Sequence, residues 1–270
     1  MTVEYKELTE KEHFRQCADL QKRIFGVNEV DILAPHVVNM LVNKKLSLGV
    51  GFGAFEKVNG KDNLIGFIIN CATFSDHSFY GIMVGISPEY RSQNIGFGLI
   101  NKIREVGLER KIFWLYGIFD PLEGNLGNLY FNKFGFLGVK YEKSAYELNE
   151  DYHSAEKVPV DKVLFRWDMY SSRANEKLAG TYQKKTLPEV LKQYPLIQED
   201  RFVDSDGVLV EIPEDFLALK GKNRQEALRW RLRTGKIFDE YVNNRGFHIT
   251  EFYSERTNGK RKNYYLLESR

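Results

Sequence analysis

The chain has 270 residues, of which 43% are hydrophobic and 28% are charged, as is typical of a soluble globular protein. Its 39 basic and 37 acidic residues nearly balance, so the composition does not indicate a nucleic acid as partner. No apolar run approaches the roughly 18 residues that a membrane-spanning helix needs, and the N-terminal segment is too charged for a signal peptide. We therefore expect a cytoplasmic protein with no membrane partner and with Cys17 and Cys71 reduced.

Hydrophobic periodicity predicts a mixed α/β fold in the first half of the chain. The predicted elements, in chain order, are a strand over 3–8, a helix that follows it and ends near 24, a helix over 34–45, strands over 46–58, 64–74 and 79–87, a helix that ends near 109, a strand over 111–120, a short helix over 125–136 and a strand over 138–148. The helix that ends near 109 lies between two apolar strands, which predicts a parallel crossover.

The second half begins with a polar stretch that resembles a linker. Further elements are predicted there: strands over 162–170 and 208–212, a long helix over 224–243, and strands over 247–255 and 262–269. Asn258-Gly259 is a strong hairpin signal between the last two strands. A strand, a Pro-containing turn, a helix and a strand occur in both halves of the chain. This echo indicates a degenerate half-repeat, although any unit of two strands and a connecting helix would look similar.

One segment of the first half, "SPEYRSQNIGFGLINKI" from Ser87 to Ile103, carries the clearest functional signal. It joins an apolar strand to a helix, whose first N–H groups and dipole favour an anion such as phosphate. Gly96 and Gly98 would let a ligand approach the backbone, and Asn94 tolerates a left-handed conformation. The alternative is a plain turn in which the glycines serve helix packing. No P-loop is present, and the third glycine of a dinucleotide fingerprint is absent.

The same segment resembles the pyrophosphate-binding signature of the GNAT acyltransferases, Q/R-x-x-G-x-G/A. Arg91 falls on its first position, Asn94 on its first glycine and Gly96 on its last position. A second segment of the family resembles "NLGNLYFNKFGF", which supplies Asn125, Lys133, Gly135 and Phe136. Together with the predicted order of elements, the two motifs extend the resemblance over about residues 1–148. Later segments resemble a poorly characterised two-part GNAT group of prokaryotes, over nearly the whole chain.

The resemblance implies a GNAT-like mixed central sheet flanked by helices in residues 1–148. Residues 149–270 would form an α/β extension, with the half-repeat, packed on this domain. Acetyl-CoA or another short acyl-CoA would bind as co-substrate, and no metal is expected. Its pyrophosphate would lie beside Arg91 on the N–H groups of Gln93, Asn94, Ile95, Gly96, Phe97 and Gly98, with Asn125 also in contact. A backbone N–H near Ile86 would polarise the thioester carbonyl, and the pantetheine arm would enter a gap between the strands over 79–87 and 111–120.

The general acid and base are less clearly marked in the sequence. Phe131 occupies the position of the family's usual tyrosine, which often protonates the leaving thiolate, and Tyr130 is one residue away. Asp120, at the C-terminal end of a strand, and His77, in a loop, are candidates for the base. We expect an N-acyltransferase acting on a small amine or amino acid, as a monomer or homodimer. The alternative is a non-catalytic module that binds or senses acyl-CoA.

Overall fold

The structure is a computed structural model that describes residues 3–25, 32–46, 48–74, 77–145, 158–198, 201–257 and 259–269. The chain forms two compact units, which are described separately below. The first is Met1–Gly117 with Asp168–Tyr170, and the second is Ile118–Trp167 with Ser171–Arg270. The predicted domain boundary at residues 148/149 lies outside the described residues. Strands from both sides of this boundary pair within the second unit, so the compact units do not follow it.

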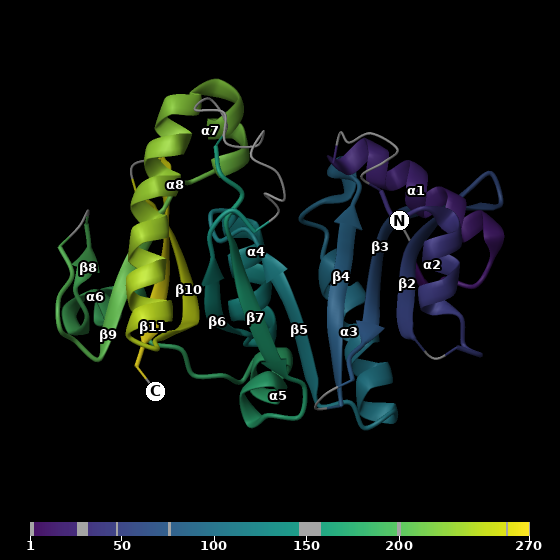
Figure 1. Ribbon diagram of the computed structural model, residues 1–270, viewed down its shortest axis with the longest axis horizontal. Coiled ribbons are helices and arrows are strands. Elements are labelled where there is room, and N and C mark those ends of the chain that lie inside the picture. The colour runs from purple at the N-terminus through teal and green to yellow at the C-terminus, as the bar shows by residue number, and fades with distance from the viewer. Residues whose placement is uncertain are drawn as a thin grey trace. The chain divides into compact units, whose positions relative to one another are not determined.

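The first unit contains five strands and three α-helices among its described residues (Figure 1). In chain order they are β1 (Glu4–Glu7), α1 (Lys11–Phe25), α2 (Pro35–Val42), β2 (Gly49–Val58), β3 (Lys61–Ala72), β4 (Ser78–Ile86), the 3₁₀ turn η2 (Pro88–Tyr90), α3 (Ile95–Glu109) and β5 (Trp114–Phe119). The chain passes into the second unit within β5. Each predicted strand and helix of this region is found, with ends shifted by a few residues.

The strands of the first unit lie side by side in the order β1-β2-β3-β4-β5. Neighbours pair antiparallel from β1 to β4, and β4 pairs with β5 in parallel. The predicted parallel crossover through α3 is therefore confirmed. Since a right-handed crossover places its helix on one face of the sheet, α3 connects the end of β4 to the start of β5 across that face.

The two faces of this sheet are covered by different helices because strand side chains alternate in direction. Phe67 and Ile69 of β3 point into a buried apolar cluster with residues of α1 and α2. Gly66 points to the opposite face, where a Cβ atom on it would lie 3.2 Å from the side chain of Ile95 in α3. The start of α3 is thereby fixed against the centre of the sheet.

The second unit contains six strands that follow the crossover strand, together with several short helices. Its elements are α4 (Gly124–Gly127), the π-helical turn η3 (Asn128–Phe134), β6 (Leu137–Glu142), β7 (Lys162–Asp168), α5 (Ser172–Ala179), α6 (Leu187–Gln193), β8 (Leu196–Ile197), β9 (Gly207–Ile212), α7 (Phe216–Lys222), α8 (Arg224–Phe238), the π-helical turn η5 (Asp239–Asn244), β10 (His248–Thr257) and β11 (Lys260–Glu268). The predicted short helix over 125–136 corresponds to α4 and η3, and the predicted long helix to α8 and η5.

The strands of the second unit follow the order β7-β6-β10-β11-β9-β8. The predicted hairpin is confirmed by the antiparallel pairing of β10 with β11, although Asn258 itself lies outside the described residues. β9 and β10 flank β11, whereas β4 and β5 pair directly. The second strand–turn–helix–strand segment thus has a different strand order from the first, which weakens its interpretation as a half-repeat.

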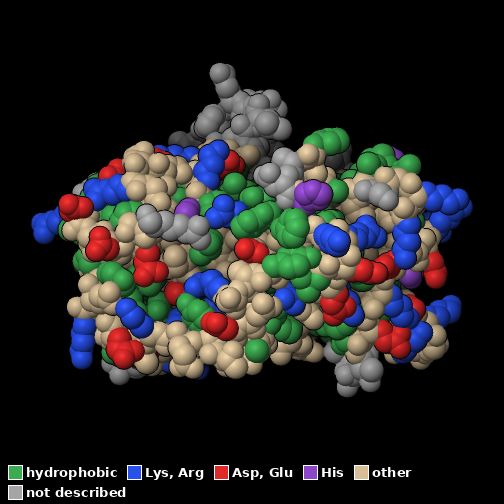
Figure 2. Space-filling view, turned by 90° about the horizontal axis from the view of Figure 1, so that it is seen from below, with side chains coloured by type: hydrophobic (Ala, Val, Ile, Leu, Met, Phe, Trp, Pro, Cys, Tyr) green, Lys and Arg blue, Asp and Glu red, His purple; other side chains and the backbone are tan. Residues whose placement is uncertain are grey.

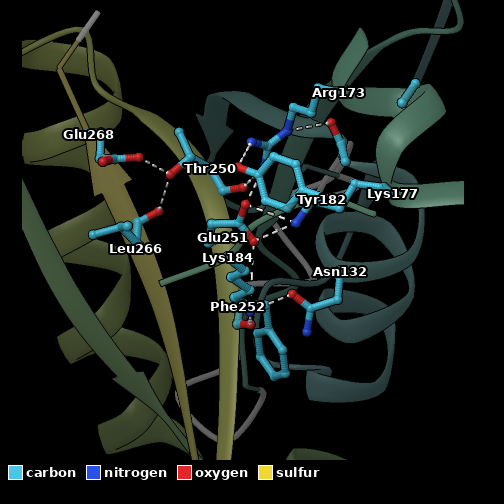
Figure 3. Close-up of polar contacts among 12 residues, drawn as sticks. Asn132, Arg173, Lys177, Tyr182, Lys184, Thr250, Glu251, Phe252, Leu266 and Glu268 are labelled. Atoms are coloured by element: carbon cyan, nitrogen blue, oxygen red, sulfur yellow. Dashed lines mark hydrogen bonds and ion pairs between the residues drawn. The ribbon is translucent and has the colours of Figure 1, made fainter. Parts of the chain in front are cut away.

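A buried ionic cluster connects α5 and the residues after it with β10 (Figure 3). Glu251 is 5% exposed and accepts hydrogen bonds from Lys177 (2.9 and 2.8 Å) and Arg173 (2.8 Å). Lys184 lies 3.7 Å from the same carboxylate and also donates to Asn132 (2.8 Å). Residues 171–185 form a polar stretch for which no element was predicted from the sequence. α5 was missed because its apolar face is narrow and its polar side chains are satisfied by a distant carboxylate.

Acidic and basic side chains are interspersed with apolar ones on the face shown in Figure 2, in line with the nearly balanced composition. Within the described ranges, no helix is both long and apolar enough to cross a membrane. The same part of the chain holds no group of three His, Cys, Asp or Glu side chains arranged to bind a metal ion.

Candidate functional site

The turn between β4 and α3 has a backbone suited to an anion. Ser92 and Asn94 both adopt the left-handed conformation, with φ of 62° and 61°. Closely spaced left-handed residues in a turn orient successive N–H groups toward one concave side, where anions bind. The left-handed backbone expected of Asn94 is confirmed, and Ser92 is a second left-handed residue that was not predicted from the sequence. Residues 91–94 are exposed, so the concave side is accessible.

The first N–H groups of α3 precede its hydrogen-bond ladder. Gly98 donates the first intrahelical bond, to the carbonyl of Asn94 at 3.0 Å. The N–H groups of Ile95 and Gly96 come before it and therefore have no partner within the helix. The side chain of Asn94, the N-cap, makes no capping hydrogen bond. These donors and the helix dipole favour a phosphate at this position.

The two glycines of the motif do not serve one purpose. A Cβ atom at Gly98 would lie 2.2 Å from Cζ of Tyr5 in β1. That glycine is required for packing, as the alternative interpretation of the sequence proposed. The side chain of Ile95 is buried and Gly96 has none, so any contact of these two residues with a ligand would come from their backbone N–H groups. The packing and phosphate interpretations are thus compatible, because the N–H of Gly98 is already bonded to Asn94 within the helix, whereas the N–H groups of Ile95 and Gly96 are not.

The turn is anchored on both sides. The N–H of Ser87 donates to the carbonyl of Ile65 in β3 at 2.9 Å, and the Tyr90 hydroxyl donates to Glu56 in β2. Anchors of this kind hold the backbone donors in place before a ligand arrives.

Arg91 and Gln93 lie on this turn and Ile86 ends the strand before it, and their predicted contacts with coenzyme A remain predictions. Arg91 donates through Nε to the carbonyl of Ile86 at 3.3 Å, which keeps its guanidinium beside the turn. Gln93 donates to the carbonyl of Glu89 at 3.1 Å. Both side chains are exposed, and Phe97 is half-buried. The turn thus brings together one exposed cation and the backbone donors that precede the helical ladder.

β4 and β5 are paired over only part of their length. The paired residues are Ser78 with Trp114, Phe79 with Leu115 and Tyr80 with Tyr116. β4 continues for six residues beyond Tyr80, to Ile86, where it remains paired with β3 alone. Most of this continuing stretch is only half-buried, which is unusual for a strand inside a sheet. The separation lies next to the turn, as the predicted gap for the pantetheine arm requires.

His77 is not brought to this turn. It precedes β4, and the nine residues of that strand span about 26 Å at 3.3 Å per residue. His77 is exposed, has a φ of 45°, and its carbonyl accepts from the N–H of Phe113 at 2.8 Å. Its contacts are those of a strand-initiating turn, and its role as a base remains a prediction.

Asp120 lies in the second unit and is engaged by an arginine. Its side chain pairs with Nη2 of Arg231 at 2.5 Å and also accepts from the N–H of Leu122 at 2.9 Å. Arg231 is 2% exposed and Asp120 is 8% exposed, so the pair is largely removed from water. Sequence reasoning could not identify this partner, which is 111 residues away. Its ion pair gives Asp120 a structural role, and its catalytic role remains a prediction.

Tyr130 and Phe131 are both part of an aromatic cluster in the second unit. Tyr130 is 4% exposed and stacks on Phe136 with ring centroids 5.0 Å apart. Burial raises the pKa of its phenol well above the ordinary value. Phe131 is fully buried and packs against Tyr265 and Phe119, as expected for a packing residue. Both side chains are buried, so neither position of η3 faces solvent.

Asn125 is exposed and lines a polar pocket of about 330 Å³ in the second unit. The other lining residues are Gly124, Asn128, Glu214, Phe252, Ser254, Glu255, Arg256, Arg261 and Asn263. An adjoining pocket of about 240 Å³ shares four of these residues with it, Asn125 included. The predicted contact of Asn125 with coenzyme A remains a prediction.

Comparison with known proteins agrees with this architecture. No family model and no curated protein matched the sequence. Among solved structures, a protein from Desulfovibrio desulfuricans assigned to the GNAT acetyltransferase family has a TM-score of 0.50 and 12% identity, over 62% of this chain and 99% of that chain. The chain has the GNAT acetyltransferase fold. The resemblance inferred from the two motifs is thereby confirmed at the level of the fold.

Two further solved structures are similar over about the same share of this chain. An acetyltransferase of the GNAT family from Streptococcus pneumoniae has a TM-score of 0.48 and 16% identity, over 61% of this chain and 98% of that chain. NAA60 from Arabidopsis thaliana, solved with a bisubstrate analogue, has a TM-score of 0.49 and 17% identity, over 62% of this chain and 98% of that chain.

Proposed function

We propose that the protein is an acyl-CoA-dependent N-acyltransferase that transfers an acetyl or other short acyl group to a small amine or amino acid. The observation that carries the proposal is the separation of β4 from β5 directly beside the turn at Arg91–Gly98. The turn supplies donors for a pyrophosphate, and the separated β4 supplies free backbone groups for the pantetheine arm. The amine attacks the thioester carbonyl directly, and coenzyme A leaves as the thiol.

A non-catalytic acyl-CoA-binding module is the second candidate, and one observation favours it. The position of the family's usual tyrosine is occupied by Phe131, which is fully buried and has no ionisable group. The neighbouring phenol of Tyr130 is enclosed by aromatic rings. Both candidates require acyl-CoA binding, and only the enzyme releases free thiol from acetyl-CoA when it is given an amine.

Binding is tested by thermal shift with coenzyme A, acetyl-CoA and succinyl-CoA. A ligand at ten times its dissociation constant adds about 1.4 kcal/mol to the free energy of unfolding. Gln93→Glu places a carboxylate beside the proposed pyrophosphate and should abolish the shift. Gly96→Glu should do the same, but Gly96 is buried, so the exposed Gln93 gives the cleaner variant.

Gln183→Glu is the matched control. Gln183 is also exposed and donates to a nearby carbonyl, that of Thr181. This variant should keep the full shift. No shift with any of the three compounds would refute acyl-CoA binding, and an equal shift in Gln93→Glu would refute the proposed location. A panel of amines and amino acids with acetyl-CoA, followed by thiol release, then distinguishes the enzyme from the binding module.

A further inference from the structure

Asn70 is a buried amide with no partner among the described residues. It lies in β3 within an otherwise apolar run, and its side chain is fully buried. Neither its Oδ1 nor its Nδ2 atom has a hydrogen-bond partner in the described part of the chain. A buried amide left unsatisfied is costly, and proteins rarely keep one without a reason.

Asn263 of the second unit shows how such a residue is normally accommodated. It is 2% exposed, and its Nδ2 atom donates to the carbonyls of Pro213 (3.2 Å) and Glu214 (3.3 Å). The two asparagines are buried to a similar degree, but among the described residues only the side chain of Asn263 has hydrogen-bond partners. The hydrogen-bond partner of the Asn70 side chain is therefore to be sought in a bound ligand.

The position of Asn70 supplies that explanation. In the pairing of β3 with β4 it lies opposite Gly81, at a bulge where the register shifts from Ile69–Met83 to Asn70–Gly81. Bulges often redirect side chains next to active sites. A Cβ atom at Gly81 would lie 3.5 Å from Oδ1 of Asn70 and 3.5 Å from the carbonyl oxygen of Tyr116. The missing side chain therefore leaves a space with a polar atom on each side.

This space lies where β4 and β5 separate. Gly81 is the first residue of β4 beyond the last pair, Tyr80 with Tyr116, and it is itself partly exposed. From Ile86, beside the turn, to Gly81 the strand covers five residues, or about 16 Å. A pantetheine arm that starts at the turn and follows β4 inward carries its thioester toward this inner end, past the backbone N–H near Ile86 that the family resemblance implies as the donor to the carbonyl.

We infer that Asn70 is an acyl-binding residue whose amide N–H donates a hydrogen bond to the thioester carbonyl oxygen of the bound acyl-CoA. The inference rests on the proposed function. A half-turn about the terminal bond of asparagine presents either its nitrogen or its oxygen, so the donor can face the ligand. When an amine adds to the carbonyl carbon, the C–N bond forms and the oxygen becomes negative. Asn70 then stabilises this oxyanion, without giving up a proton, until the C–S bond breaks and the thiolate leaves.

The test compares two ligands that differ only in the acyl group. Dissociation constants for coenzyme A and acetyl-CoA are measured by calorimetry for the wild type and Asn70→Leu, which has a similar volume. Asn70→Leu should weaken acetyl-CoA binding about tenfold, as the loss of one buried hydrogen bond predicts, and leave coenzyme A binding unchanged. The melting temperature of the free variant should equal or exceed that of the wild type, because no hydrogen bond is lost. Asn263→Leu, the matched control, should melt at a lower temperature.

The outcomes separate this inference from the proposed function. Equal weakening of both ligands by Asn70→Leu, or unchanged binding of acetyl-CoA, would overturn the inference alone. A melting temperature lowered as much as in Asn263→Leu would also overturn it, since Asn70 would then have a structural partner. Binding of neither ligand by the wild type would overturn the proposed function and this inference together.

Discussion

Replacing Glu251 by glutamine should strongly destabilise the second unit. The carboxylate is 5% exposed and accepts hydrogen bonds from Lys177 and Arg173. The side chain of Lys177 is itself only 3% exposed, so its charge would remain buried without a counter-charge. Removing the charge of one partner of a buried ion pair lowers the free energy of unfolding by about 3–5 kcal/mol. Glutamine keeps one acceptor oxygen, so we expect a loss near the lower limit, about 3 kcal/mol.

Hydrogen exchange of backbone amides in β10 measures this loss in the second unit alone. A loss of about 3 kcal/mol lowers the protection of the slowest amides by more than about 100-fold. Glu240→Gln is the control, because Glu240 pairs with Arg245 in the same unit (2.8 Å) but at the surface, where ion pairs contribute little. Its protection should stay close to that of the wild type.

A second variant tests whether the unpaired charge causes the loss. Glu251→Leu combined with Lys177→Met removes the carboxylate together with its most deeply buried partner. Apolar replacements of buried ion pairs are often neutral, so protection should recover most of the way to wild type. Wild-type protection in Glu251→Gln, or no recovery in the double variant, would refute this account of the cluster.

Three further predictions follow from individual contacts. Gly98→Ala should lower the melting temperature, because the new Cβ atom would clash with Tyr5. In a Tyr5→Ser background, where this clash is absent, the same change should raise the melting temperature, since alanine favours a helix over glycine by about 1 kcal/mol. Burial lowers the pKa of Lys184 to about 8 in the folded protein, whereas an unfolded lysine has a pKa of about 10.4. Between about pH 8 and 10 the unfolded chain therefore binds more protons than the folded protein, so the free energy of unfolding rises with pH. Urea titrations at pH 7–10 should show this rise in the wild type and a weaker one in Lys184→Met. Asp120→Asn should lower the free energy of unfolding of the second unit by about 1–3 kcal/mol in urea, because the buried Arg231 would lose its nearer counter-charge and keep only the more distant carboxylate of Asp161, 4.0 Å from its Nε atom; unchanged stability would contradict the ion pair.

The first unit was predictable because its sequence patterns are local. Apolar runs bounded by turn residues predicted β2, β3 and β4, and the motif after Ser87 predicted the turn and α3. The left-handed backbone of Asn94 follows from its residue type. The gap between β4 and β5 came from the family resemblance, and no residue pattern on either strand marks the point where pairing stops.

The second unit was harder to predict because its structure depends on distant partners. β6 pairs with β10 across more than a hundred residues, at Gly138 and Ile249. α5 has few apolar residues and is held by Glu251, 74 residues from Lys177. The pairing of Asp120 with Arg231 is of the same kind. A single sequence gives no signal that these residues meet, so Asp120 looked like a free carboxylate at a strand end.

Asn70 and Glu251 show why the roles of polar residues in this chain could be predicted only in part from its sequence. Each is a polar residue inside a strand of buried apolar and aromatic side chains, in "FIINCA" and "HITEFY". Neither residue was predicted from the sequence to have a role. In the structure, Glu251 is satisfied by cations from α5, so its burial contributes to the fold. Asn70 has no such partner among the described residues and lies where two strands separate. Because a fold has no reason to keep an unsatisfied amide for its own stability, Asn70 is the better candidate for function.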